Sequence, residues 1–133
     1  MRSRLILLLA GFTYALFGAG GIAAAQSLST QSSGAAGVTV KATPRALTGG
    51  AWEFEIVFDT HTQELNDDLV KTASLLADGK PLAPAGWQGD PPGGHHRKGV
   101  LKFGATDPGP QAIELQIQRP GESAPRAFRW QLK

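Results

Sequence analysis

Every histidine of the chain lies in one of two polar segments. One segment reads D-T-H-T at 59–62, and the other reads G-D-P-P-G-G-H-H-R-K at 89–98. Neutral imidazole is a good ligand for copper and zinc, and carboxylates complete many such ligand sets. The two segments therefore predict a transition-metal site, with Cu or Zn as the expected ion. Its candidate ligands are His61, His95, His96, Asp59 and Asp90.

The same residues also fit a purely structural role. No H-x-H or H-x-x-x-H spacing is present in the chain. Asp59 can bond the backbone of its own loop, and Asp90 can cap the Pro-Pro turn or pair with Arg97. One histidine can be a buried, hydrogen-bonded strut. The sequence thus leaves two functions open: a metal-binding domain, or a protein–protein interaction or assembly module whose polar loops are fixed by internal bonds.

The residue patterns of common enzyme sites are missing from the chain. Beyond residue 37 the serines are Ser74 and Ser123, and neither lies in the G-x-S-x-G context of an exposed catalytic serine. The chain has no cysteine, which excludes thiol catalysis. The Gly93-Gly94 pair lacks the lysine and the following helix of a phosphate-binding loop. We therefore expect a non-enzymatic protein.

The first 25 residues have the pattern of a secretory signal peptide. Arg2 and Arg4 form a positive start, an apolar stretch follows, and Ala23-Ala24-Ala25 offers the small residues that a signal peptidase requires. Glycines interrupt the apolar run before it is long enough for a membrane anchor. We therefore predict a signal peptide at 1–25, cleavage near Gln26, and a periplasmic or secreted protein without a membrane anchor in its mature form.

The charge of the remaining chain excludes one class of partner. Removal of residues 1–25 takes away Arg2 and Arg4 and leaves 11 basic and 11 acidic residues. Nucleic-acid binding requires a basic patch that neutralises phosphates, and no run of Lys and Arg supplies one here. The expected partner is therefore a metal ion or another exported protein, and not a nucleic acid.

The mature chain divides into a leader and one folded domain. Residues 26–37 are rich in Ser, Gln and Gly and contain one large apolar side chain, so they predict a flexible leader. Residues 38–133 are enough for one hydrophobic core. Since the chain has no cysteine, this core has to stabilise an exported domain without disulfides.

Apolar residues in the domain alternate with polar ones in several short runs. The clearest run puts Phe54, Ile56 and Phe58 on one face of an extended segment. Such runs, separated by Gly/Pro turns, predict an all-β fold: an antiparallel immunoglobulin-like β-sandwich of about seven short strands. A closed barrel is the alternative. The predicted strands are 38–43, 52–59, 70–77, 80–86, 99–104, 112–118 and 126–132.

The order of these strands predicts which loops meet. Consecutive strands of an antiparallel sandwich run up and down in turn, so the loop with His61, the 89–98 segment and the 119–126 segment share one end. Loops at the end of a rigid β-scaffold are the usual place for binding residues. This grouping requires 80–86 to be a strand. Without that strand, His61 is expected at the opposite end from His95 and His96.

Three segments of the chain resemble a family of small exported bacterial proteins of uncharacterised function. They read W-E-F-E-I-V-F-D-T-H-T, L-N-D-D-L and W-Q-G-D-P-P-G-G-H-H-R-K-G-V-L-K-F. The resemblance covers most of the mature chain. It implies export and a single compact domain, and it implies no activity.

Overall fold

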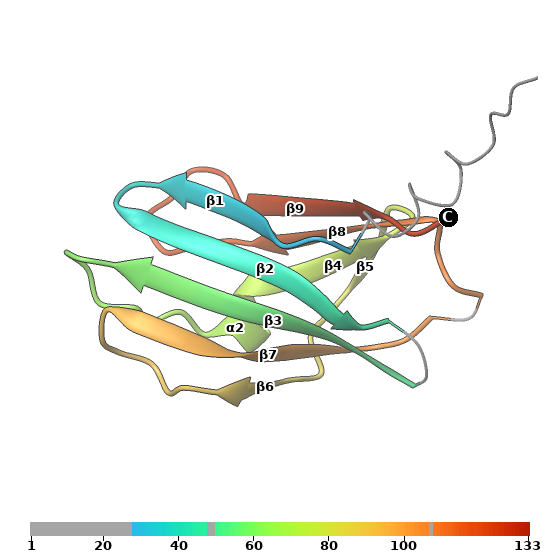
Figure 1. Ribbon diagram of the computed structural model, residues 1–133, viewed down its shortest axis with the longest axis horizontal. Helices are drawn as coiled ribbons and strands as arrows, with labels where there is room; N and C mark the ends of the chain where they lie inside the picture. Colours follow the sequence, from blue (N-terminus) through green and yellow to red (C-terminus); the bar gives the residue numbers. More distant parts are fainter. Residues whose placement is uncertain (1–27, 48–49, 107) are drawn as a thin grey trace, which may run out of the picture.

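Two antiparallel sheets face one another in this protein (Figure 1). The computed structural model describes residues 28–47, 50–106 and 108–133, and this part of the chain holds nine strands and one short helix, α2 (Leu69–Thr72). The strands are β1 (Gln31–Ala35), β2 (Val38–Ala46), β3 (Ala51–Thr60), β4 (Ala73–Ala77), β5 (Lys80–Leu82), β6 (Gly86–Gly89), β7 (His96–Gly104), β8 (Ala112–Ile117) and β9 (Arg126–Gln131).

Alternation along the strands places one face of each sheet in a shared core. In β3, Phe54, Ile56 and Phe58 are fully buried, whereas the residues between them are partly exposed. This two-residue period arises because each sheet packs one face inward and hydrates the other. The ring of Phe54 packs edge-on against Phe103 of β7, with centroids 5.8 Å apart, and lies 5.6 Å from the ring of Trp130 in β9. The contact of Phe54 with Trp130 therefore joins the two sheets.

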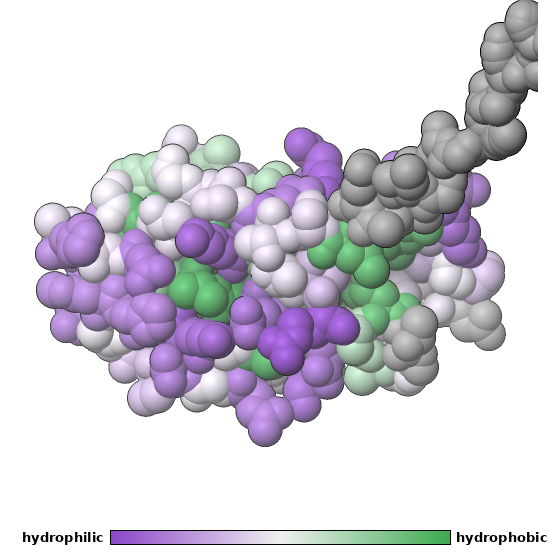
Figure 2. Space-filling view, in the orientation of Figure 1, coloured by the Kyte–Doolittle hydropathy of each residue, from purple (hydrophilic) through white to green (hydrophobic). Residues whose placement is uncertain are grey.

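The outer face over β2, β3 and β7 is mostly polar. Figure 2 shows hydrophilic side chains across this side of the molecule, with small apolar areas between them. Glu55 on β3 lies 2.7 Å from Arg45 and 3.8 Å from Lys98 on the flanking strands. Exposed ion pairs of this kind add little stability. Their role is to keep a broad sheet face hydrated.

The strand order is that of an immunoglobulin-like sandwich with two strands added. One sheet has the order β1-β2-β3-β7-β6, and the other has the order β5-β4-β8-β9. In immunoglobulin lettering, β2, β3, β7 and β6 are strands A, B, E and D of one sheet, and β4, β8 and β9 are strands C, F and G of the other. β5 is an extra strand beside C. The predicted all-β antiparallel sandwich is therefore confirmed, and the barrel alternative is wrong. β1 lies outside this set, at the edge beside β2.

Two predicted strands are divided or shortened in the structure, and two others are longer than predicted, since 38–43 extends to Ala46 and 99–104 begins at His96. The segment 80–86 is not one strand: it forms β5 in one sheet and begins β6 in the other. Pro81 and Pro84 account for the break, because proline cannot donate to a ladder and the chain leaves the first sheet between them. The predicted strand 70–77 begins only at Ala73, since the residues before it form α2.

The prediction of a flexible leader over 26–37 is wrong for residues 31–35. They form β1, which pairs antiparallel with β2, from Gln31 opposite Ala42 to Ala35 opposite Val38. The turn between the two strands consists of Ala36 and Gly37. Composition was misleading because β1 is held by hydrogen bonds, to β2 and to Arg126 and Arg129, and not by apolar packing, so it leaves no apolar pattern in the sequence.

The predicted signal peptide, 1–25, lies outside the described residues, and so does the start of the leader at 26–27. Within 28–47, 50–106 and 108–133, no helix is long and apolar enough to cross a membrane. The buried apolar side chains of this part form a single cluster, to which both sheets contribute.

Candidate functional site

Four connections meet at one end of the sandwich, which we call the loop pole (at the left in Figure 1). They are the β1–β2 turn at 36–37 and the segments 61–68, 90–95 and 118–125. Since β3 and β7 are neighbours, the end of β3 lies beside the start of β7, and the backbone N–H of Thr60 donates to the carbonyl of His95 at 3.0 Å. The two histidine loops thus share one end, as predicted. The pairing of β3 with β7 places them there, although 80–86 is not the single strand that the prediction assumed.

The two histidine loops also bond each other along their backbones. The N–H of Leu65 donates to the carbonyl of Gly94 at 3.0 Å, and the N–H of Gly93 donates to the carbonyl of Leu65 at 2.9 Å. Gly93 and Gly94 have φ angles of 116° and 76°, a region that glycine adopts without steric cost. The segments 61–68 and 90–95 therefore form one bonded unit.

The histidine side chains lie on the surface of this unit. His61, His95 and His96 are all exposed, so the alternative of a buried histidine strut is wrong. Nδ1 of His96 lies 2.5 Å from Oδ1 of Asp59, its cross-strand neighbour. Within the part of the chain that the structure describes, no group of three or more His, Cys, Asp or Glu side chains lies close enough to hold a metal ion. The structure thus joins Asp59 with His96 and does not assemble the five predicted ligands.

Asp90, the fifth predicted ligand, bonds the backbone of its own hairpin. Its Oδ2 accepts from the backbone N–H of Lys98 at 2.9 Å. Its carbonyl accepts from the indole N–H of Trp87 at 3.0 Å and from Nε–H of Arg97 at 3.1 Å. Asp90 therefore fixes the β6–β7 connection, which is the loop-fixing role left open by the sequence.

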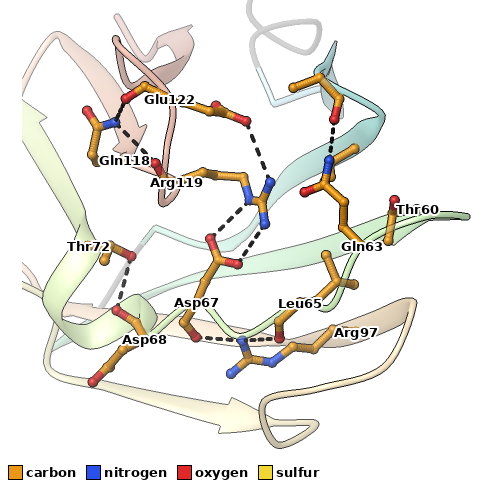
Figure 3. A network of polar contacts seen from close by, with 12 residues as sticks. Thr60, Gln63, Leu65, Asp67, Asp68, Thr72, Arg97, Gln118, Arg119 and Glu122 are labelled. Carbon is orange, nitrogen blue, oxygen red and sulfur yellow. Dashed lines mark hydrogen bonds and ion pairs between the residues drawn. The ribbon is translucent and has the colours of Figure 1, made fainter.

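Arg97 holds both histidine loops from the inside. The residue is only 2% exposed, and its Nη1 donates to the carbonyls of Leu65 at 3.4 Å and Asp67 at 2.6 Å (Figure 3). Its guanidinium lies 5.3 Å from the centre of the Trp87 ring, within cation–π range. Burial lowers the pKa of Arg97 below its ordinary value, and the nearby Asp67 opposes that shift. A guanidinium stays charged under such conditions, so one cation satisfies carbonyls from two loops.

A second buried arginine joins the 61–68 loop to the other sheet. Arg119, just after β8, forms a two-pronged ion pair with Asp67, with Nε–Oδ2 at 3.1 Å and Nη2–Oδ1 at 3.0 Å. The two side chains are 4% and 0% exposed. Nη1 of Arg119 also lies 3.5 Å from Glu122, as Figure 3 shows. This planar, doubly bonded geometry is what offsets the cost of removing both charges from water.

A third buried arginine connects the 118–125 segment with β1. Nε and Nη2 of Arg126 bond the carboxylate of Glu122, each at 2.8 Å. The same guanidinium donates to the carbonyls of Ser33 at 2.8 Å and Ala35 at 2.9 Å. The hydrogen bonds from Arg126 hold the pKa of Glu122 below its ordinary value, so the pair is ionised at neutral pH.

Sequence reasoning missed these arginines as buried groups, although a signal was present. Every second residue of β7, β8 and β9 points into the core. Arg97 occupies such a position before the apolar residues of β7, and Arg126 does so before those of β9. Arg119 occupies the next such position after the end of β8. A charged residue at an inward position next to an apolar run is expected to be buried and paired. The phase of the alternation would have identified all three, extended by one step for Arg119 and Arg126 and by two steps, past Gly99, for Arg97.

Two hollows on the described surface are lined without any histidine. At the loop pole, an open hollow of about 360 Å³ is lined by Ala35, Ala36, residues 121–124 and Arg126. Its lining includes Ser123 but no histidine that could act as a base. A hollow of about 450 Å³ lies on the other sheet, between Leu76 and Trp130, and its lining contains no histidine either.

Comparisons with known proteins identify no relative. No protein-family model matches the chain, and no curated protein or solved structure matches it significantly. A functional inference for this chain therefore depends on the geometry of the loop pole.

Proposed function

We propose that this protein is an exported, non-enzymatic interaction module that binds another exported protein at its loop pole. One observation supports this proposal above the others. The buried arginines Arg97, Arg119 and Arg126 fix the loop backbones, while the histidines stay exposed. A surface whose backbone is fixed before binding loses little conformational entropy when a partner docks.

The exposed part of the loop pole suits a protein partner of mixed polarity. Imidazole and carboxylate groups there can exchange hydrogen bonds and charge with a partner, which favours specificity. The two prolines add apolar contact area and have almost no side-chain entropy to lose. The exposed residues that combine these properties are His61, Glu64, Pro91, Pro92 and His95.

Site-specific photo-crosslinking tests the proposal. A photoreactive amino acid replaces His95 at the loop pole, and in a matched control it replaces Lys80, which is exposed on β5 at the other end of the sandwich. Each variant is expressed in its native host and irradiated. We expect a discrete protein adduct from position 95 that is missing from position 80. No adduct from position 95, or the same adducts from both positions, would contradict the proposal.

A second candidate function is transition-metal binding centred on His96. A carboxylate that bonds one ring nitrogen of a histidine orients the imidazole and leaves the other nitrogen available to a metal ion. Asp59 has this relation to His96, at 2.5 Å. His61 and His95 lie on adjoining, exposed segments, and their side chains are the further candidate ligands for Cu or Zn.

Calorimetric titration with Cu(II) and Zn(II) separates the two candidates. The metal candidate predicts a Kd below about 10 μM, roughly 7 kcal/mol of binding free energy. It also predicts that His96→Ala abolishes binding, whereas the neighbouring exposed Lys98→Ala does not. Weaker binding by the unaltered protein would remove the metal candidate and leave the interaction module.

Export is proposed from the N-terminal sequence. Cleavage near Gln26 would leave β1 whole, because β1 begins at Gln31. N-terminal sequencing of the protein from periplasmic and culture fractions checks this proposal. A product that keeps residues 1–25 in the inner membrane would contradict it.

A further inference from the structure

β1 is an added strand that contributes almost nothing to the hydrophobic core. The immunoglobulin-like set of strands is complete from β2 to β9, and β1 lies at the outer edge of its sheet. The sequence of β1, Q-S-S-G-A, supplies no large apolar side chain, and none of its residues is buried. Beside it, β2 places Val38, Val40 and Ala42 in the core. Detachment of β1 would therefore leave the packing of the domain in place.

Hydrogen bonds hold β1 to the rest of the protein. Besides the ladder with β2 and the guanidinium of Arg126, the side-chain amide of Gln31 bonds both the N–H and the carbonyl of Arg129. The indole N–H of Trp130 donates to the carbonyl of Ser29 at 2.7 Å. All of these partners belong to β2 and β9. A second copy of the chain can supply an identical β1 to the same partners, because an exchanged element reproduces its original contacts.

The turn that folds β1 back onto β2 is strained. Ala36 and Gly37 have φ angles of 51° and 79°, the left-handed region in which the Cβ of alanine crowds the next carbonyl. Tight turns with two such residues favour Asn-Gly instead. The end of β3 and the loop after it hold this turn. Nε2 of Gln63 donates to the carbonyl of Ala36 at 2.5 Å (Figure 3). Oγ1 of Thr60 donates to the carbonyl of Gly37 at 2.8 Å. Short strained connections of this kind favour exchange of the element they carry.

From these features we infer that β1 is an exchangeable strand. In the exchanged dimer the 36–37 turn opens, and β1 of each copy pairs with β2 of the other copy in the register of the monomer. The partner is a second copy of this chain, and the acceptor is the edge of β2 that β1 now covers. Opening the turn releases Ala36 from its left-handed conformation. This self-association is tested separately from the proposed docking, because pairing of β1 with β2 of another copy requires no other protein, although the 36–37 turn that opens belongs to the loop pole.

A pair of introduced cysteines distinguishes strand exchange from any other dimer. The chain has no cysteine of its own, and Ser32 and Lys41 are exposed partners in the β1–β2 register. The full-chain Ser32→Cys/Lys41→Cys variant is incubated reduced at high concentration, separated by size, and then oxidised. In an exchanged dimer each disulfide joins two chains, so we expect a covalent dimer on a denaturing gel without reductant. In the monomer the disulfide closes within one chain. The two single-cysteine variants measure random crosslinking.

Two substitutions in the same background shift the equilibrium in opposite directions. Ala36→Asn creates the favoured Asn-Gly turn and should lower the fraction of covalent dimer about tenfold. Gln63→Ala removes one hydrogen bond to the closed turn and should raise the fraction of covalent dimer about fivefold. A dimer fraction whose disulfides are all within single chains would overturn the inference. So would the absence of covalent dimer from every variant, or a fraction that neither substitution changes.

Discussion

Arg97 acts on backbone carbonyls more than on other charges. Its guanidinium donates to the carbonyls of Leu65, Asp67 and Asp90, which belong to two different loops. A lysine has the same charge but lacks the planar fork that reaches several carbonyls at once. The shape of the guanidinium therefore decides how the two histidine loops lie against each other.

Replacement of this side chain should destabilise the whole domain. Arg97→Met leaves buried carbonyls without a donor, at about 1 kcal/mol for each of three lost bonds, so we expect a loss of about 3 kcal/mol. The adjacent Lys98 points outward, and Lys98→Met should change the free energy of unfolding by less than about 0.5 kcal/mol. Equilibrium unfolding in urea measures both variants. Equal effects at the two positions would contradict the role of Arg97.

Neighbouring aspartates provide a second matched pair. Asp67 is fully buried against Arg119, whereas the side chain of Asp68 is 57% exposed. Asp67→Ala leaves a buried arginine without its main partner and should cost about 3–5 kcal/mol. Asp68→Ala should cost less than about 1 kcal/mol, because exposed ion pairs contribute little. Thermal and urea unfolding of both variants check this difference, and a small loss for Asp67→Ala would refute it.

Among the strands, β6 depends on close approach to β7. A Cβ added at Gly99 of β7 would lie 2.4 Å from Cζ2 of Trp87 and 2.9 Å from the carbonyl oxygen of Gln88. The indole of Trp87 therefore covers the space above Gly99, and β6 can pair with β7 only because that residue has no side chain. By contrast, a Cβ at Gly86 of β6 would meet nothing within 4 Å.

The two glycines should respond differently to alanine. Gly99→Ala forces Trp87 or the β6 backbone to move and should cost about 1–3 kcal/mol, the usual range for overpacking. Hydrogen exchange should quicken at the amides of Ala85 and Asp90, which bond β7. Gly86→Ala should leave stability and exchange nearly unchanged. Retained protection of both amides in Gly99→Ala would show that β6 does not depend on this contact.

Strands with an apolar face were predictable from the sequence, and strands without one were not. The alternation of Phe54, Ile56 and Phe58 predicted nearly the whole length of β3. β1 was missed because hydrogen bonds to β2 and to Arg126 hold it, and none of its own side chains enters the core to give an apolar pattern. The division of 80–86 was missed for a different reason. Pro81 and Pro84 separate two strands of different sheets, and the alternation of residue types does not show to which sheet an extended segment belongs.

At the scale of the whole molecule, the buried ion pairs make the free energy of unfolding depend on pH in the acid range. The pKa of Glu122 is held below its ordinary value of 4.5, chiefly by hydrogen bonds from Arg126. A carboxyl group with a lowered pKa contributes fully above its unfolded-state pKa, and this contribution is lost as the pH falls through the folded-state pKa. The Tm should therefore fall as the pH drops below about 4.5. The lowered pKa of Glu114, which bonds Gln116 and Arg129, acts in the same direction.

A single substitution tests this acid dependence. Glu122→Gln cannot form the ionised pair with Arg126, so its Tm at neutral pH should be lower than that of the unaltered protein. Its fall below about pH 4.5 should be smaller, because one titrating group is gone. Calorimetry across this range makes the comparison. Parallel pH profiles would show that the Glu122–Arg126 pair does not contribute to acid sensitivity.

The location of the candidate site was predictable, but its internal bonding was not. The sequence placed the two histidine loops at one end, and the bond between Thr60 and His95 agrees with that placement. The side chains of His61, His95 and His96 lie on the surface, whereas the groups that fix the loops are arginines at inward strand positions. Residue types suggested metal chemistry, and only the three-dimensional contacts reveal which of these residues have structural partners.

Hydrogen exchange at the loop pole tests most directly whether this surface is rigid before any partner binds. The amides of Thr60, Leu65 and Gly93 bond carbonyls across the two histidine loops. If these bonds and the buried arginines fix the loops, the three amides should exchange at least about a hundredfold more slowly than in an unstructured peptide. The same protection should be lost in Arg97→Met. Exchange of the three amides in the unaltered protein at the rate of an unstructured peptide would contradict the account.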